Sequence, residues 1–436
     1  MDRHRPSVPK RAPPDPNAHV SPNALHCYAF GMRSNGSGSK KLCLLACLFA
    51  VACGGPNAGS NLEGDAGDAG NSDAGSADAG NTDAGNTDAG GSDAGGSGTS
   101  PTIAGCPILP SNHAFNTPVD KLPVDANSAA YLGTIGAHNF HLDLGTTTTQ
   151  SAADYYGIPY NVVHGNSLTW TPVHFHSADT SLNWDARAEA DCATPAAGHP
   201  VVAPCTTQAA PNVVLPIPAA PLVEGGLDAT PSQPYGDHHI LMLDADTCRL
   251  WETYHSYPLG GGGWDIYGSA SFDLRSNALR PAGWTSADAA GFPILPLLLR
   301  ADEASTGEIK HALRFTILSS KIRNTYIWPG RHLTSNGGSS ASKPPMGQLF
   351  RIKSSYVIPS SFHTQSKAIL QAMKTYGFYV ADGGSDLYVT GEPSAAWAST
   401  TFSEVQSVGS SVIEAVDVTP IFARAGFDPN SAAVPP

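Results

Sequence analysis

A stretch of Asp-Ala-Gly repeats from about residue 54 to residue 100 divides this 436-residue chain into parts that obey different folding rules. Regularly spaced aspartates alternate there with Ala, Gly, Asn, Ser and Thr, and there is no aromatic side chain. Such a segment cannot bury enough apolar surface to offset its chain entropy, and its like charges extend it. It also lacks the Gly-Gly-x-Gly-x-Asp period of calcium-binding repeats. We therefore expect residues 53–100 to be a disordered tether and residues 101–436 to carry the fold.

Residues 1–52 have the features of a leader and export signal. Lys40 and Lys41 precede an uncharged apolar run from Leu42 to Ala52. A basic flank, a short apolar core and small residues before the processing point are typical of a signal peptide. The run is shorter than the roughly 20 apolar residues that cross a bilayer. Met32 would give a signal of ordinary length, so we expect translation to start there.

The processing point has a recognisable sequence. Ala50-Val51-Ala52-Cys53 resembles the lipobox of bacterial lipoproteins, with Ala50 at the position usually held by Leu. The resemblance implies cleavage before Cys53 and lipid attachment to its thiol and amine. The mature protein would then be anchored outside the cytoplasm, to outer-membrane lipid or the cell surface, unless it is released.

Charge and linker composition limit the partners and the number of domains. The formal net charge is −13 at pH 7, and the region after the tether is itself acidic. An acidic surface argues against binding to nucleic acid. No second Gly/Ser/Asp-rich linker interrupts residues 101–436, so we expect one globular domain. We also expect a monomer.

Four cysteines in the globular region predict an oxidising compartment. Four cysteines allow three pairings. We favour Cys192–Cys205, which closes a short Pro/Ala-rich loop, and Cys106–Cys248, which joins the start of the domain to its centre. A zinc site is the alternative, but the expected C-x₂-C clusters are absent.

Short β-rich runs separated by Pro and Gly indicate a mainly-β fold. We expect a β-sandwich or jelly-roll-like domain with long loops and one or two short helices. One helix is expected from Thr285, with Asp288 completing a capping box. Another is expected over Gln365 to Tyr376, where an apolar stripe ends before Gly377. The expected strands are 160–163, 167–170, 172–175, 213–215, 239–243, 250–254, 312–317, 350–353 and 379–381.

The segment from Asp237 to His255 predicts a hairpin with an acid–base cluster. If the turn lies at 244–247, Leu243 faces Cys248 and His239 faces Glu252. Alternation then places Asp237, His239, Glu252 and Tyr254 on one face of the sheet. These groups are suited to catalytic proton transfer. A structural His–Glu hydrogen bond is the alternative.

Two histidines form a weaker signal for a metal. His174 and His176 would project from one face of a strand, and an H-x-H pair on a strand can hold a metal ion. Solvent- or substrate-facing imidazoles are the alternative. We predict no other cofactor.

Other candidates come from the loops and from the aromatic residues. Asp288 and Asp382 are candidate carboxylates, although Asp288 suits a helix cap and Asp382 precedes a Gly-Gly turn. Arg314 and His311 could bind substrate oxygens, or Arg314 could pair with a buried acid. The aromatic faces that could stack on sugars include Trp284 and Trp264.

Three stretches resemble a family of secreted bacterial and fungal proteins: residues 283–291, residues 344–347 (Pro-Pro-Met-Gly) and residues 381–385 (Ala-Asp-Gly-Gly-Ser). The resemblance covers about residues 107–417 and implies a secreted globular domain, without an activity that transfers. No G-x-S-x-G, P-loop, Rossmann or H-E-x-x-H motif occurs, which counts against serine hydrolase, nucleotide-dependent and zincin chemistry.

These features favour a surface-tethered, polysaccharide-degrading enzyme. A glycoside hydrolase would use a carboxylate pair, with Glu252 as the acid and Asp237, Asp288 or Asp382 as its partner. A polysaccharide lyase would instead use His239 or Tyr254 as the base and Arg314 against a uronate. A non-catalytic carbohydrate-binding or adhesin module and a metal-dependent oxidative enzyme remain as alternatives.

Overall fold

A computed structural model describes residues 100–176, 185–207, 212–227 and 237–436. The chain divides into two units, Met1–Asp88 and Ala89–Pro436, and every described residue belongs to the second. The predicted export signal, Cys53 and residues 54–99 of the predicted tether lie outside the described residues. Within the described ranges, no helix is both long and apolar enough to cross a membrane.

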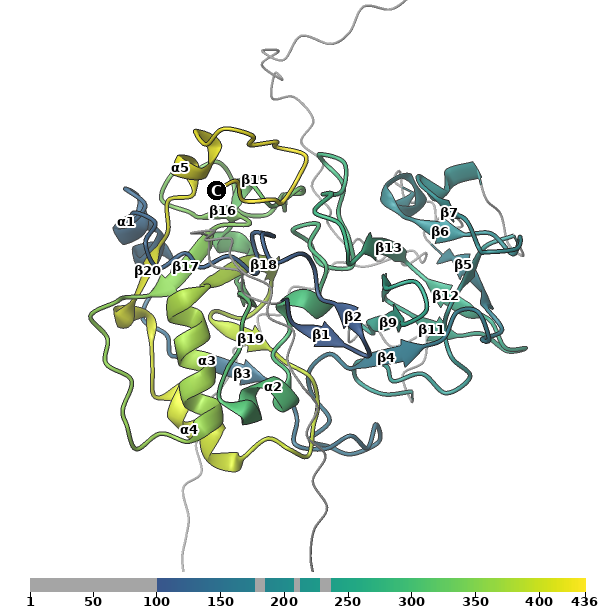
Figure 1. The fold of residues 1–436 in the computed structure, drawn as a ribbon, viewed down its shortest axis with the longest axis horizontal. Helices are drawn as coiled ribbons and strands as arrows, with labels where there is room; N and C mark the ends of the chain where they lie inside the picture. The colour runs from purple at the N-terminus through teal and green to yellow at the C-terminus, as the bar shows by residue number, and fades with distance from the viewer. Residues whose placement is uncertain (1–99, 177–184, 208–211, 228–236) are drawn as a thin grey trace, which may run out of the picture. The chain divides into compact units, whose positions relative to one another are not determined.

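The fold is mainly β, as the sequence predicts, and three larger sheets build it (Figure 1). The first has four strands, in the order β13 (Gly268–Asp273), β10 (Arg249–Tyr254), β9 (Ile240–Asp244) and β4 (Tyr160–Val163). The second has the order β11 (Tyr257–Pro258), β12 (Trp264–Ile266), β5 (Thr171–Phe175), β8 (Val214–Leu215), β6 (Cys192–Ala193) and β7 (Val201–Val202). The third has the order β20 (Ile413–Ala415), β17 (Leu349–Ile352), β18 (Phe378–Gly383), β14 (Leu313–Ile317), β19 (Tyr388–Thr390) and β3 (His141–Asp143). Two short pairs complete the set: β1 (Thr102–Ile103) with β2 (Cys106–Pro107), and β15 (Arg323–Tyr326) with β16 (Pro345–Met346).

Parallel pairs occur within these sheets. β14 runs parallel to β18, β19 to β3, and β4 to β9. The short β-rich runs predict strands but not their direction. Most of the expected runs form strands close to their expected limits, whereas residues 167–170 are not in a strand.

The four-stranded sheet is covered on both faces. Leu241 and Leu250 belong to the larger apolar core, which also contains the third sheet. Met242 and Trp251, on the opposite face, belong to a second core with β5, β6 and β8. Every residue of β9 is therefore buried, instead of every other one. This sheet separates the two cores and carries residues of the candidate site.

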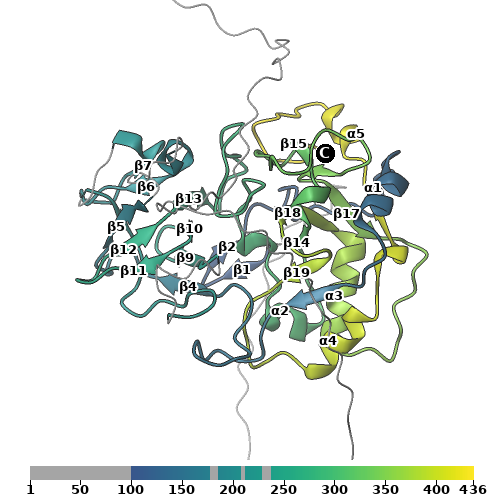
Figure 2. The same cartoon turned by 180° about the vertical axis from the view of Figure 1, so that it is seen from behind.

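The helices are short and few. They are α1 (Ser128–Ile135), α2 (Ala301–Thr306), α3 (Thr364–Thr375), α4 (Ser399–Gln406) and α5 (Thr419–Phe422). α3 matches the predicted helix, and the left-handed Gly377 follows it. Both views show α3 beside α2 and α4 (Figures 1 and 2). The helix expected from Thr285 was wrong: residues 284–286 have no regular structure and 287–290 form a bend and a turn, because the Asp288 side chain pairs with the buried Arg314.

The hairpin of β9 and β10 forms with a register two residues away from the predicted one. Leu243 faces Leu250, and Glu252 faces Leu241. The loop takes residues 245–248, and Asp244 closes it by accepting hydrogen bonds from the Thr247 hydroxyl and the Asp246 N–H. Side chains alternate between the two faces of a strand, so a shift of two residues leaves each side chain on its predicted face.

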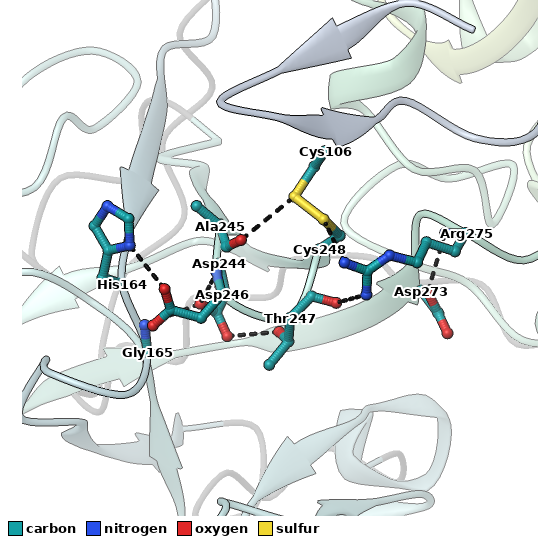
Figure 3. Close-up of a disulfide and its surroundings, with 10 residues drawn as sticks. All are labelled: Cys106, His164, Gly165, Asp244, Ala245, Asp246, Thr247, Cys248, Asp273 and Arg275. Carbon is teal, nitrogen blue, oxygen red and sulfur yellow. Dashed lines mark hydrogen bonds and ion pairs between the residues drawn. A yellow bond between two sulfur atoms is a disulfide. The ribbon is translucent and has the colours of Figure 1, made fainter.

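Both predicted disulfides are present. Cys106 is bonded to Cys248 at the end of this loop, and Cys192 to Cys205. Figure 3 shows Arg275 donating to Cys248 Sγ and to the Thr247 carbonyl oxygen, which fixes the same loop. Disulfides form and persist in oxidising compartments, so the unit belongs to an extracytoplasmic environment.

The two disulfides should differ in their contribution to stability. Cys106–Cys248 spans 142 residues and Cys192–Cys205 spans 13. All four cysteines are buried, so the cavities left by Cys→Ala replacement are comparable. Loop-closure entropy then predicts that the variant lacking the longer link loses about 2 kcal/mol more unfolding free energy. Urea denaturation of the two double Cys→Ala variants measures this, and equal losses would contradict it.

Candidate active site

A cavity of about 330 Å³ lies where strand ends from the first and third sheets meet. The end of β10 supplies Tyr254, the residue before β13 supplies Tyr267, and the end of β18 supplies Asp382. Asp237 lines the cavity just before β9. The remaining lining residues include Ala186, Glu189, Ala190, Gly268, Ser269, Thr285, Ser286, Ala287, Ala289, His332 and Gly383. Its volume is at the lower end of the range for small-molecule sites.

Asp382 reaches the cavity through a strand irregularity. Phe315 pairs with Val380 but the next residue, Thr316, pairs with Asp382, so Ala381 is the extra residue of a bulge. Bulges re-aim side chains next to functional sites. Burial, together with the charge of Asp288, raises the pKa of Asp382 to about 7, although Arg314 and the Gly383 N–H oppose this rise. Asp382 is therefore a carboxyl group that can hold its proton near neutral pH.

Asp237 and Tyr254 stand beside Asp382. Asp237 is exposed, and its backbone oxygen accepts a hydrogen bond from the His255 N–H. Burial, with Asp237 and Asp382 nearby, raises the pKa of the Tyr254 phenol above its ordinary value. The phenol thus stays protonated and can donate a hydrogen bond at neutral pH.

His239 is an imidazolium in a closed ion pair. Its Nδ1 lies 2.6 Å from Glu224 Oε2, and its Nε2 lies 3.0 Å from the Ala287 carbonyl oxygen. Both partners are acceptors, so both ring nitrogens donate. Burial alone would lower the pKa of His239, but Glu224 outweighs burial and raises it to about 9. The predicted His239 base has no free lone pair.

Glu224, Asp237 and His239 offer ligand atoms that all lie within 4.8 Å of one another, which makes them a candidate metal set among the described residues. A metal ion at His239 would have to displace the Nδ1 proton that His239 donates to Glu224. The closed ion pair therefore disfavours this set as a metal centre.

Arg314 and Asp288 are a buried structural pair. Arg314 Nε and Nη2 lie 3.0 and 2.9 Å from the two oxygens of Asp288. Neither side chain lines the cavity, and Asp288 is fully buried. Of the alternatives open in the sequence, the pairing of Arg314 with a buried acid is the one that the structure contains.

Glu252 is sealed away from the cavity. It is fully buried and accepts hydrogen bonds from the Ile294 and Leu295 N–H groups at the start of a 3₁₀ turn, Leu295–Leu297. Burial raises its pKa to about 7, against the lowering effect of these two N–H groups. Glu252 shares a sheet face with His239 and Tyr254, as predicted, but its carboxyl group binds backbone N–H groups and does not line this cavity.

The other predicted substrate-binding residues also lie off the cavity. His311 is buried between the Ala312 carbonyl oxygen and Glu303. Trp264 belongs to the second core. The Trp284 ring packs against Arg280, whose guanidinium carbon lies 5.5 Å from the centre of the ring.

His174 and His176 share one carboxylate. Their Nδ1 atoms lie 2.7 and 3.2 Å from the two oxygens of Asp265. Burial would raise the pKa of Asp265, but the two imidazoles outweigh burial and lower it. Within the described ranges, the pair does not appear in a three-residue set with metal-ligand spacing.

Sequence reasoning missed Glu224 and Glu189, and it considered Asp143 only as a further ligand for the His174/His176 pair. Burial, with Glu224 nearby, raises the pKa of Asp143, which therefore belongs to the same acidic neighbourhood. A signal for Glu224 was present: Glu224-Gly225-Gly226 repeats the acid-Gly-Gly pattern at Asp382. Gly225 and Gly226 have φ values of 73° and 88°, a conformation that favours glycine.

No known protein family, curated protein or solved structure is detectably similar to this chain. The site must therefore be interpreted from its own chemistry.

The raised pKa of Glu252 predicts a pH dependence of stability. The unfolded side chain loses its proton near pH 4.5, whereas the folded one holds it to about pH 7. The unfolding free energy therefore falls as pH rises through this window, by at most about 1.4 kcal/mol per pH unit from this group. Glu252→Gln keeps an acceptor oxygen but cannot titrate, so its unfolding free energy should fall less steeply between pH 4.5 and 7. Urea denaturation at several pH values measures the two slopes, and parallel profiles would contradict the assignment.

Proposed function

We propose that the unit Ala89–Pro436 is a glycoside hydrolase whose carboxylate pair is Asp382 and Asp237. The observation that carries the proposal is that both carboxyl groups line one cavity together with the Tyr254 phenol. One of them, Asp382, has a pKa raised to about 7. Glycosidic cleavage uses one carboxyl group as an acid and a second as a base or nucleophile.

The roles follow from the two environments. Asp382, half-buried and protonated, donates its proton to the glycosidic oxygen as the bond to the anomeric carbon breaks. Asp237, exposed, either takes a proton from the attacking water or bonds to the anomeric carbon itself. The Tyr254 phenol, which lines the same cavity, donates a hydrogen bond to the bound sugar. The configuration of the released sugar distinguishes inversion from retention.

The lyase alternative has less support. A lyase needs a base with a free lone pair or a phenolate, whereas both nitrogens of His239 are donors and the raised pKa of Tyr254 keeps its phenol protonated. It also needs a cation against the uronate, whereas Arg314 is held by both oxygens of Asp288. The hydrolase uses groups that line the cavity.

We place this activity outside the cytoplasm, on a protein anchored by lipid at Cys53. The lipobox-like Ala50-Val51-Ala52-Cys53 and the Asp-Ala-Gly tether support the anchor, and the disulfides support the compartment. A long solvated tether would let the domain reach a polymer beyond the membrane surface.

Neutral replacement of the pair should remove activity while preserving the fold. Loss of general acid–base catalysis costs about 10²–10⁴-fold in rate, so Asp382→Asn and Asp237→Asn should lose at least about 10²-fold in kcat/KM. Asp382→Asn should also be at least as stable as the wild type above pH 7, because it removes a charge that burial disfavours. Release of reducing ends from a polysaccharide panel and thermal melting measure the two effects.

Glu252→Gln is the matched control, since it changes a buried carboxyl group that does not line the cavity. It should keep wild-type activity. Full activity in Asp382→Asn, or loss of activity in Glu252→Gln with an intact fold, would contradict the assignment.

The pKa of Asp382 also predicts the alkaline limit of the activity. An acid must carry its proton, so kcat should decline above about pH 7 by about tenfold per pH unit. A pH–rate profile on the most responsive polymer measures this limit. Constant activity to pH 9 would exclude Asp382 as the acid.

A further inference from the structure

The cavity wall carries acidic side chains and, among the described residues, no lysine or arginine. Glu189, Asp237 and Asp382 line it, and within the described ranges neither Lys nor Arg does. The three internal segments outside the description, 177–184, 208–211 and 228–236, contain no Lys, Arg or His. These segments therefore cannot add a positive side chain to the cavity.

Four arginines in the neighbourhood of the lining residues have carboxylate, carbonyl or amide-oxygen partners. Arg187 pairs with Asp185, and Arg314 with Asp288. Arg280 pairs with Asp191 and donates to the Thr285 and Glu189 carbonyl oxygens. The fourth, Arg331, donates to the backbone oxygens of Arg280 and Pro429 and to Asn430 Oδ1. A carboxylate ligand in the cavity would have to compete with these contacts for a guanidinium.

His332 is the one lining residue of the described chain that could carry a positive charge. Its Nδ1 lies 3.1 Å from the Ala289 carbonyl oxygen, so Nδ1 donates. In the neutral ring, Nε2 is then an acceptor.

We propose that the cavity selects a sugar that carries an ammonium group, accepts neutral sugars less well, and rejects uronates. This inference rests on the proposed hydrolase function and names its substrate class. The carboxylates of Asp237 and Glu189 border a confined, partly desolvated space, so they attract an amine and repel a carboxylate that finds no cation there.

The experiment uses polymers with one linkage and different charge. Chitosan carries amines on a β-1,4-linked glucose backbone, cello-oligosaccharides are neutral, and C6-oxidised cellulose carries carboxylates. Reducing ends are measured with the purified protein for each polymer. Binding of glucosamine, glucose and glucuronate is measured in parallel by saturation-transfer NMR titration, at low salt and at 0.5 M NaCl.

We expect glucosamine to bind at least about 10-fold more tightly than glucuronate at low salt, with a smaller ratio at high salt. Asp237→Asn should reduce this ratio, because it removes one of the lining charges. Asp120→Asn, at an exposed aspartate away from the cavity, should leave the ratio unchanged.

The outcomes separate the two proposals. Glucuronate binding as tight as glucosamine binding, or chain ends released from the oxidised cellulose as readily as from chitosan, would overturn the selectivity and leave the hydrolase standing. The expected binding order with no chain ends from any polymer, in this linkage or in a wider panel, would overturn the hydrolase and leave the selectivity. If the preference for glucosamine over glucuronate is unchanged in Asp237→Asn, the preference comes from another surface of the protein, and the inference is overturned.

Discussion

The buried ion pair between Arg314 and Asp288 is the interaction on which the candidate site depends. Arg314 comes from β14 in the third sheet, and Asp288 from the loop that lies over the cavity. Removing one partner would leave an uncompensated buried charge, which typically costs about 3–5 kcal/mol. The pair therefore fixes the loop to the sheet.

The same pair contributes to the electrostatics of its neighbours. Burial is the main cause of the raised pKa values of Asp382 and Glu252; the charge of Asp288 adds to both, and Arg314 limits the rise at Asp382. Two carboxyl groups with similarly raised pKa values thus have different surroundings. Glu252 faces backbone N–H groups inside the core, whereas Asp382 faces a cavity. Access of a substrate to the carboxyl group, and not its pKa alone, distinguishes a chemical role from a structural one.

Sequence patterns predicted the local features of the fold well. Alternation identified the shared face of His239, Glu252 and Tyr254, and the apolar stripe identified α3 almost to the residue. The disulfide pairing was also correct. The shared face and the helix depend on residues that are neighbours in sequence, and the disulfides were a choice among only three possible pairings.

The long-range partners could not be predicted. Nothing local indicates that Glu252 meets the backbone of Ile294, or that Glu224 closes on His239. The approach of Asp382 to Asp237 depends on a bulge and on the packing of two sheets. The failed helix at Thr285 has the same cause, since a tertiary ion pair outweighed a local capping signal.

The most direct test of a neutral-pH acid in the cavity is the titration of the Asp382 carboxyl carbon by ¹³C NMR, assigned by comparison with Asp382→Asn. A midpoint near pH 7, which moves lower in Asp237→Asn as a like charge is removed, is the result that this structure predicts. A midpoint near 3.8, the ordinary value for an aspartate, would contradict the assignment of Asp382 as the acid.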